Sequence, residues 1–102
     1  MNIFENWKIM PIVRVLTFSN IKQIIGKKLF LMDTDNIENL LAQLIDKYGI
    51  PLKQELYDEE GNFRKIYRIL VNGRNIHILH GFQTKLEEED MVVIMPAIAG
   101  GI

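Results

Sequence analysis

One amphipathic segment, flanked on both sides by short strand-like runs, limits the folds that this chain can adopt. Between residues 37 and 48, apolar residues recur every three or four positions, which places them on one face of a helix. They are Ile37, Leu40, Leu41, Leu44, Ile45 and Tyr48. Asp35 and Glu38 have the spacing of a capping box at its start, and Gly49 and Pro51 are predicted to stop it.

Strand patterns occupy much of the remaining chain. We expect two strands before the helix and three after it, at residues 12–18, 28–32, 66–71, 74–78 and 91–95. The Asn72-Gly73 dipeptide predicts a tight turn between the third and fourth of these. This order predicts an α+β fold, with a sheet of four to five strands packed on one main helix.

The connecting segments have turn-like compositions. Residues 19–26 predict a loop or short helical turn that ends at Gly26. Residues 50–65 predict an exposed excursion, and 81–90 a connecting loop. A chain of 102 residues fits one domain. We assign 1–10 as an N-terminal extension, 11–96 as the domain and 97–102 as a flexible tail.

The composition argues against several classes of function. Twelve basic and thirteen acidic residues give a net charge of -1, which argues against a nucleic-acid partner. The chain has no cysteine, so disulfides and thiolate chemistry are excluded. Its longest apolar run, at residues 91–95, is far shorter than the about 20 residues of a membrane span. The N-terminus lacks the pattern of a secretory signal, so a cytoplasmic location is expected.

The last predicted strand is apolar at five consecutive positions, so both of its faces require cover. One helix covers one face only. Either the strand is central with an irregular loop over its back, or its outer face is a protein interface. Phe18, Met91, Val93 and Met95 are the candidate interface residues, and ordinary core packing is the alternative for them.

The chain ends in a run of small residues that includes Gly100 and Gly101, after Pro96, Ala97, Ile98 and Ala99. Glycine is costly to order and adds nothing to a core, so stability alone explains this pair poorly. A narrow, unbranched tail fits entry into another protein's site. An activated acyl group on glycine also cannot epimerise, because glycine has no chiral centre.

These features together resemble the ubiquitin-like sulfur carriers of the MoaD/ThiS family, which include the small subunit of molybdopterin synthase and, more distantly, the thiamine-pathway carrier. The resemblance covers residues 11–101. It rests on the opening strand, the helix after Thr34, the Val71-Asn72-Gly73 turn, residues 86–90 and the Val93-Ile94-Met95-Pro96 run before the diglycine.

The resemblance implies a β-grasp fold and a specific chemistry at Gly101. In this family an activating enzyme uses ATP to adenylate the terminal glycine carboxylate, which becomes a thiocarboxylate. In molybdopterin synthase the tail enters the large subunit, where the sulfur passes to the pterin precursor. The implied partners are therefore an adenylating enzyme and a synthase large subunit. The chain itself is expected to bind no cofactor and not to be a free-standing enzyme.

Three positions depart from the family pattern. Ile102 follows the second glycine and locks its carboxylate in a peptide bond. Either a peptidase removes this residue, or the chain binds partners without carrying sulfur. Ala97 replaces the second proline of a Pro-Pro pair. Glu89-Asp90 replaces a Gly-Asp turn, which removes the freedom of glycine to adopt a positive φ.

Other candidate sites have ordinary structural explanations. His77 and His80 would point to opposite faces of a strand, which argues against a zinc site. The acidic run Glu87 to Asp90 lacks the spaced ligands of a calcium loop and reads as a solvated turn. Two classes of function remain, namely a sulfur carrier and a β-grasp adaptor or protein modifier that carries no sulfur.

Overall fold

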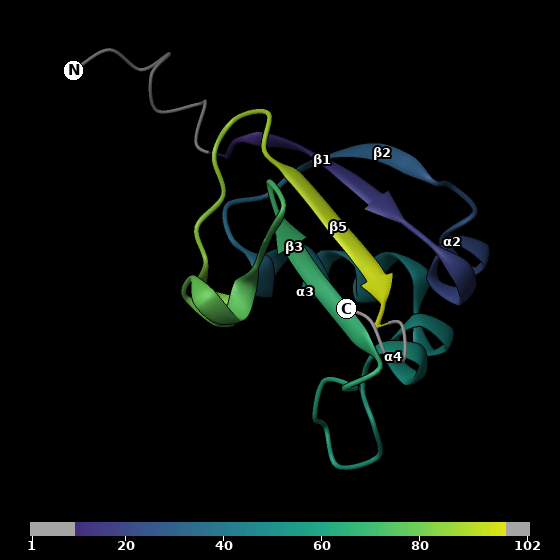
Figure 1. Ribbon diagram of the computed structural model, residues 1–102. Helices are drawn as coiled ribbons and strands as arrows, with labels where there is room; N and C mark the ends of the chain where they lie inside the picture. Colours follow the sequence, from purple (N-terminus) through teal and green to yellow (C-terminus); the bar gives the residue numbers. More distant parts are fainter. Residues whose placement is uncertain (1–9, 98–102) are drawn as a thin grey trace.

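The computed structural model describes residues 10–97, and these form a mixed five-stranded sheet backed by helices (Figure 1). The strands are β1 (Ile12–Thr17), β2 (Leu29–Asp33), β3 (Tyr67–Val71), β4 (Arg74–Asn75) and β5 (Met91–Pro96). They lie in the order β2-β1-β5-β3-β4. β1 and β5 are parallel, and the other neighbours are antiparallel. The predicted α+β fold and mixed sheet are confirmed.

Three α-helices and two short 3₁₀ turns complete the described chain. They are α2 (Ser19–Ile25), α3 (Ile37–Tyr48), α4 (Ile50–Leu56), η1 (Ile76–Ile78) and η2 (Gly81–Gln83). In Figure 1, α3 and α4 lie behind the sheet. The core fills the space between these layers, and the predicted apolar face of α3 supplies Ile37, Leu40, Leu41 and Leu44 to it.

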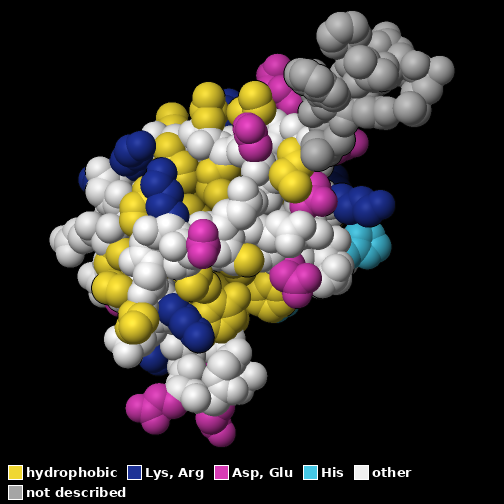
Figure 2. Space-filling model, turned by 180° about the vertical axis from the view of Figure 1, so that it is seen from behind, with side chains coloured by type: hydrophobic (Ala, Val, Ile, Leu, Met, Phe, Trp, Pro, Cys, Tyr) yellow, Lys and Arg dark blue, Asp and Glu magenta, His cyan; other side chains and the backbone are white. Residues whose placement is uncertain are grey.

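Helix α4 corrects the prediction that residues 50–65 form an exposed excursion. Gly49 does end α3, but Pro51 lies in the first turn of α4. The N–H groups of a first turn make no hydrogen bond within the helix, so proline is tolerated there. Leu52 and Leu56 are four residues apart and fully buried. Only the tip that follows is a projecting loop, held by Asp58, whose side chain accepts from the backbone N–H groups of Glu60 and Asn62. Figure 2 shows the acidic side chains at this tip.

Two further local predictions are wrong in detail. The N-cap of α3 is Asn36, whose side chain accepts from the Asn39 N–H at 2.7 Å, whereas Asp35 accepts from the Asn39 side chain. The fourth strand stops at Asn75, because its side chain accepts from the His77 N–H and starts η1 instead. The short helical turn ending at Gly26 is confirmed, with that glycine in the left-handed region at φ 83°.

The turn before β5 keeps a positive φ at Glu89, where the family pattern has a glycine. Glu89 has φ 68°, a conformation that L-residues rarely adopt. Its carbonyl accepts from the Arg14 guanidinium at 2.9 and 3.2 Å, so neighbouring contacts hold this geometry. The turn thus keeps the backbone shape of a Gly-Asp turn without the glycine.

Glu89→Gly should therefore raise the free energy of unfolding by about 0.5 kcal/mol, since relief of the left-handed strain outweighs the added entropy of glycine in the unfolded chain. Urea denaturation of the two proteins measures this difference. Glu87→Gly is the matched control, because Glu87 has no positive φ, and it should be neutral or destabilising. A loss of stability in Glu89→Gly would contradict the strain argument.

Candidate functional site

Strand β5 lies at the centre of the sheet and leads directly to the C-terminal residues. Its side chains alternate between the two faces: Val92 and Ile94 are fully buried against the helices, whereas Met91, Val93 and Met95 are half-buried on the opposite side. No helix of residues 10–97 covers that opposite side (Figure 1). β5 is therefore central in the sheet, and no helix of residues 10–97 lies over its second face, so an interface at this face stays a prediction.

The register of the sheet assembles an apolar surface around Val93. Leu16 of β1 and Leu70 of β3 lie directly beside Val93, and Leu29 of β2 lies beside Leu16. We define the outer face as this surface, formed by Leu16, Leu29, Leu31, Leu70, Met91, Val93 and Met95, with Arg14 and Arg68. Leu29 and Leu31 are 55% and 66% exposed. Contiguous exposed apolar surfaces are where proteins commonly bind partners, so the outer face is the candidate interaction site.

The outer face extends to the point where the tail leaves the sheet. A small hollow of about 100 Å³ is lined by Arg68, Leu70, Asn75, Met95, Pro96 and Ala97. The Arg68 guanidinium donates to the Lys65 carbonyl at 2.7 Å, which fixes it beside this hollow. A protein that binds the outer face would therefore also contact the start of the tail.

Pro96 is the last residue of β5, but the pairing with β3 continues one residue beyond it. Pro96 pairs with Tyr67, and the Ala97 N–H still donates to the Ile66 carbonyl at 2.6 Å. Backbone N–H groups alternate sides along a strand, so the nitrogen of Pro96 faces away from β3. On that side the pairing with β1 has already ended at Ile94. The proline therefore removes no hydrogen bond.

The base of the tail is anchored to the helical layer through Tyr67. This residue is buried, and its hydroxyl donates to the Glu55 carboxylate of α4. Burial, with a further contribution from Glu55, raises the pKa of Tyr67 far above its ordinary value. The phenol therefore remains protonated and hydrogen-bonded throughout the physiological pH range, and the β3 segment beside Pro96 is held in place.

The predicted site residues fall into three groups. Met91, Val93, Met95, Pro96 and Ala97 lie together on or beside the outer face. Phe18 follows β1 and is half-buried, with the Lys28 ammonium 5.5 Å from its ring centre. Ile98, Ala99, Gly100, Gly101 and Ile102 lie outside the described residues, as do residues 1–9.

Sequence reasoning missed the contribution of the other strands to this surface. Alternate residues of a strand point to opposite faces of the sheet, so the pattern could have identified the outward-pointing leucines of the predicted strands. They are Leu16, Leu29, Leu31 and Leu70. That alternation does not say which strands are neighbours. The pairing of β1 and β3 with β5 is what gathers these residues into one surface.

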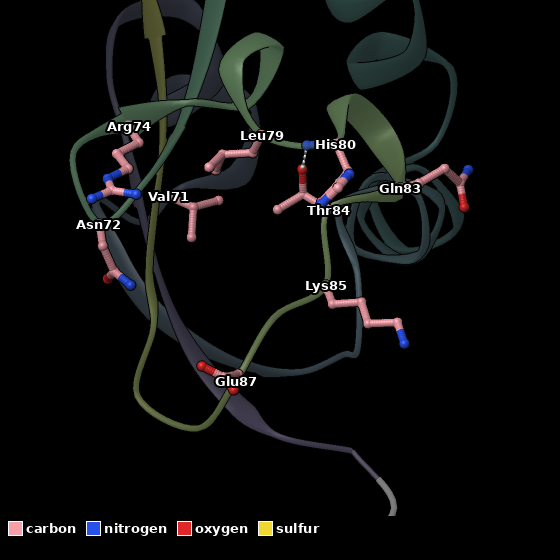
Figure 3. A pocket seen from close by; sticks show the side chains of 9 residues that line it. All are labelled: Val71, Asn72, Arg74, Leu79, His80, Gln83, Thr84, Lys85 and Glu87. Carbon is pink, nitrogen blue, oxygen red and sulfur yellow. Dashed lines mark hydrogen bonds between the residues drawn. The ribbon is translucent and has the colours of Figure 1, made fainter.

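A separate groove lies at the opposite end of the sheet from Pro96 and Ala97. It has a volume of about 960 Å³ and is lined by Val71, Asn72, Arg74, Leu79, His80, Gln83, Thr84, Lys85 and Glu87. In Figure 3 Val71 and Leu79 point into the groove, whereas Gln83 and Lys85 point away. Its charged groups thus do not converge on one point.

The other candidate sites receive no support from the geometry. His77 lies in a 3₁₀ turn, so the expectation that both histidines belong to a strand is wrong. Within residues 10–97 no three His, Asp or Glu side chains are arranged to hold a metal ion. None of the helices in this part of the chain has the length and apolar content needed to cross a bilayer.

Comparison with known proteins gives consistent matches. The ThiS family model matches residues 15–101. A protein of Archaeoglobus fulgidus assigned as a sulfur carrier is 32% identical over 65 residues, which are 64% of this chain and 73% of that protein. Small archaeal modifier protein 1 of Methanosarcina acetivorans has a TM-score of 0.75 and 31% identity, covering 90% of this chain and 98% of its own.

A more distant structure shows the fold alone. The protein of Pyrococcus furiosus assigned as subunit 1 of a molybdopterin converting factor has a TM-score of 0.65 and 20% identity, with 86% of this chain and 99% of that chain covered. The structural neighbours are β-grasp, ubiquitin-like proteins, so the predicted fold is confirmed.

Proposed function

Because this chain belongs to the ThiS family of ubiquitin-like sulfur carriers, we propose that it carries sulfur as a thiocarboxylate on Gly101 after Ile102 has been removed. The match of the family model through residue 101 supports this assignment, since it includes both glycines. In the mature chain the Gly101 carboxylate would attack the α-phosphate of ATP and release pyrophosphate. A sulfur nucleophile would then displace AMP from the carbonyl carbon.

The proposal gives the outer face and the tail separate tasks. The outer face docks the protein partner, and its continuity with Pro96 and Ala97 directs the tail into the partner's active site. Two partners are proposed, an adenylating enzyme that supplies ATP chemistry and a large synthase subunit that receives the tail. A peptidase that exposes Gly101 is a third. The proposed location of the protein is the cytoplasm.

The pterin precursor of the molybdenum cofactor is the proposed sulfur acceptor. The likeness to the molybdopterin synthase small subunit in the strand order, the Val71-Asn72-Gly73 turn and the run into Pro96 supports this choice. A second function, attachment to lysines of other proteins, is favoured by the 31% identity to a small archaeal modifier protein. Both functions use the same activated glycine carboxylate and differ in its acceptor.

Mass spectrometry of the chain lacking Ile102 tests the carrier function. With ATP, a sulfur donor and the activating enzyme of its host, this form should gain the mass of one sulfur in exchange for one oxygen. The full-length chain is the matched control and should gain nothing, because its Gly101 carbonyl is in a peptide bond. Formation of adenylate or lysine conjugates without sulfur exchange would overturn the carrier function.

Processing at Ile102 has its own measurement. The intact mass of the protein purified from its native host should be lower than that of the full chain by one isoleucine residue. A native protein that retains Ile102 would favour a partner-binding protein that carries no sulfur.

A further inference from the structure

Asn72 combines a reactive sequence with an exposed position. Of the eight asparagines in the chain, it alone is followed by glycine, whereas large apolar residues follow the other seven. The backbone nitrogen of the next residue can attack an asparagine side chain, and glycine hinders this attack least because it has no side chain. Asn72 and Gly73 are both exposed, and Asn72 lies at the rim of the groove in Figure 3.

The turn that contains Asn72 has a defined backbone shape. Val71 pairs with Arg74 across it, and its two central residues have positive φ, 49° at Asn72 and 84° at Gly73. These are the requirements of a type I′ hairpin turn. For the attack, the Asn72 side chain must rotate toward the Gly73 nitrogen. It must therefore first leave the contacts that it makes elsewhere.

Both polar atoms of the Asn72 side chain contact the start of β5. Its Nδ2 donates to the Asp90 carboxylate at 2.8 Å, and its Oδ1 accepts from the Met91 N–H at 2.9 Å. The second oxygen of Asp90 accepts from the Glu87 N–H at 2.8 Å, which fixes this carboxylate. We call the two side-chain contacts of Asn72, with Asp90 and with Met91, the turn clip.

We propose that Asn72 is a site of spontaneous deamidation and that the turn clip sets its rate. The Gly73 nitrogen forms a bond to the side-chain carbonyl carbon of Asn72 and loses its proton, and the bond from that carbon to Nδ2 breaks and releases ammonia. Water then opens the resulting cyclic imide to aspartate or isoaspartate, without any redox step. Because the leaving nitrogen is the atom that Asp90 holds, the clip must open before the reaction occurs.

Deamidation then prevents the clip from closing as before. Aspartate at position 72 would set a second carboxylate against Asp90, so that like-charge repulsion replaces a charge-assisted hydrogen bond. Isoaspartate would lengthen the backbone of the turn. Met91 is the first residue of β5 and belongs to the outer face, so the modification weakens the support of one end of this surface. The inference is independent of the sulfur chemistry proposed above.

Peptide mapping by mass spectrometry, after incubation of the full chain at mildly alkaline pH, tests the site and the clip. Asn72 should exchange an NH group for oxygen, more slowly in the folded chain than in urea. Asp90→Ala should speed this conversion in the folded chain about tenfold, because a charged acceptor no longer holds the amide. Glu59→Ala, at another exposed carboxylate, should not. Asn62 is exposed but precedes Phe63, so it should remain unconverted.

Two results would overturn the proposal. Absence of conversion of Asn72 in the urea-unfolded chain would exclude it as a site. Equal rates in the folded and unfolded chains, or an unchanged rate in a folded Asp90→Ala variant, would exclude control by the clip. If Asp90→Ala does not fold, Asp90→Asn takes its place, since it removes the charge and keeps the shape of the side chain, and it should give a smaller acceleration.

Asn72→Asp tests the consequence, because it supplies the aspartate product directly. This variant should have a lower Tm than the parent chain. Adding Asp90→Asn exchanges the amide and the carboxylate between the two positions, so the double variant should recover most of the loss. An unchanged Tm in Asn72→Asp, or no recovery in the double variant, would overturn the proposed repulsion at the clip.

Discussion

A Val93→Lys carrier lacking Ile102 should be loaded with sulfur at least 100-fold more slowly than the same carrier with Val93. Val93 lies at the centre of the outer face, between Leu16 and Leu70. A partner that fits this apolar surface would have to bury an unpaired ammonium group, which costs several kcal/mol. Residues near the centre of an interface also carry most of its binding energy.

The loading rate must be compared with the stability of the variant. The Val93 side chain is only half-buried, and a lysine can extend its charged end from this face into water, so the fold should remain intact. Circular dichroism and the Tm measure this. Ile78→Lys is the matched control for charge and for general effects on solubility, and it should load at the normal rate. Normal loading of a folded Val93→Lys protein would exclude the outer face as the docking surface.

Leu52→Ala should lower the free energy of unfolding by about 2–5 kcal/mol, the usual cost of removing a buried leucine side chain. Leu52 is fully buried, although it lies in a segment whose sequence pattern predicts an exposed loop. Small domains have about 5–15 kcal/mol of total stability. The loss should therefore take a large part of it and lower the Tm markedly.

The neighbouring exposed position provides the comparison for this variant. Lys53→Ala on the same helix should change stability by less than about 0.5 kcal/mol, because it alters no buried contact. Chemical denaturation of both variants measures the difference. Equal, small effects at positions 52 and 53 would mean that α4 does not pack into the core as the structure has it.

The sequence alone predicted most of the architecture, because the signals were local. The spacing of Leu40, Leu41 and Leu44 identifies α3 from one face of a helix. The five strand runs identify the sheet with errors of one or a few residues. The Glu89-Asp90 departure marked a position where glycine's freedom is lost, and the structure shows that Glu89 has the positive φ that a glycine would otherwise supply.

Local signals failed where two interpretations of the same residues competed. Pro51 was interpreted as a helix stop, but in the structure it starts α4, and proline is compatible with both positions. Asp35 and Asn36 are both good N-cap residues, and in the structure the Asn36 side chain caps the helix by accepting from the Asn39 N–H. Pro51 starts a helix because the rest of the fold buries Leu52 and Leu56, which follow it.

The sequence determined the helix, the strands and the diglycine end of the chain, since each depends on residue types within a few positions of one another. Only the tertiary structure decided which strands are neighbours. That decision places β5 at the centre of the sheet, brings Leu16 and Leu70 beside Val93, and leaves the edge of β2 free. Strand pairing joins residues far apart in the chain, so a local sequence pattern does not predict which strands become neighbours.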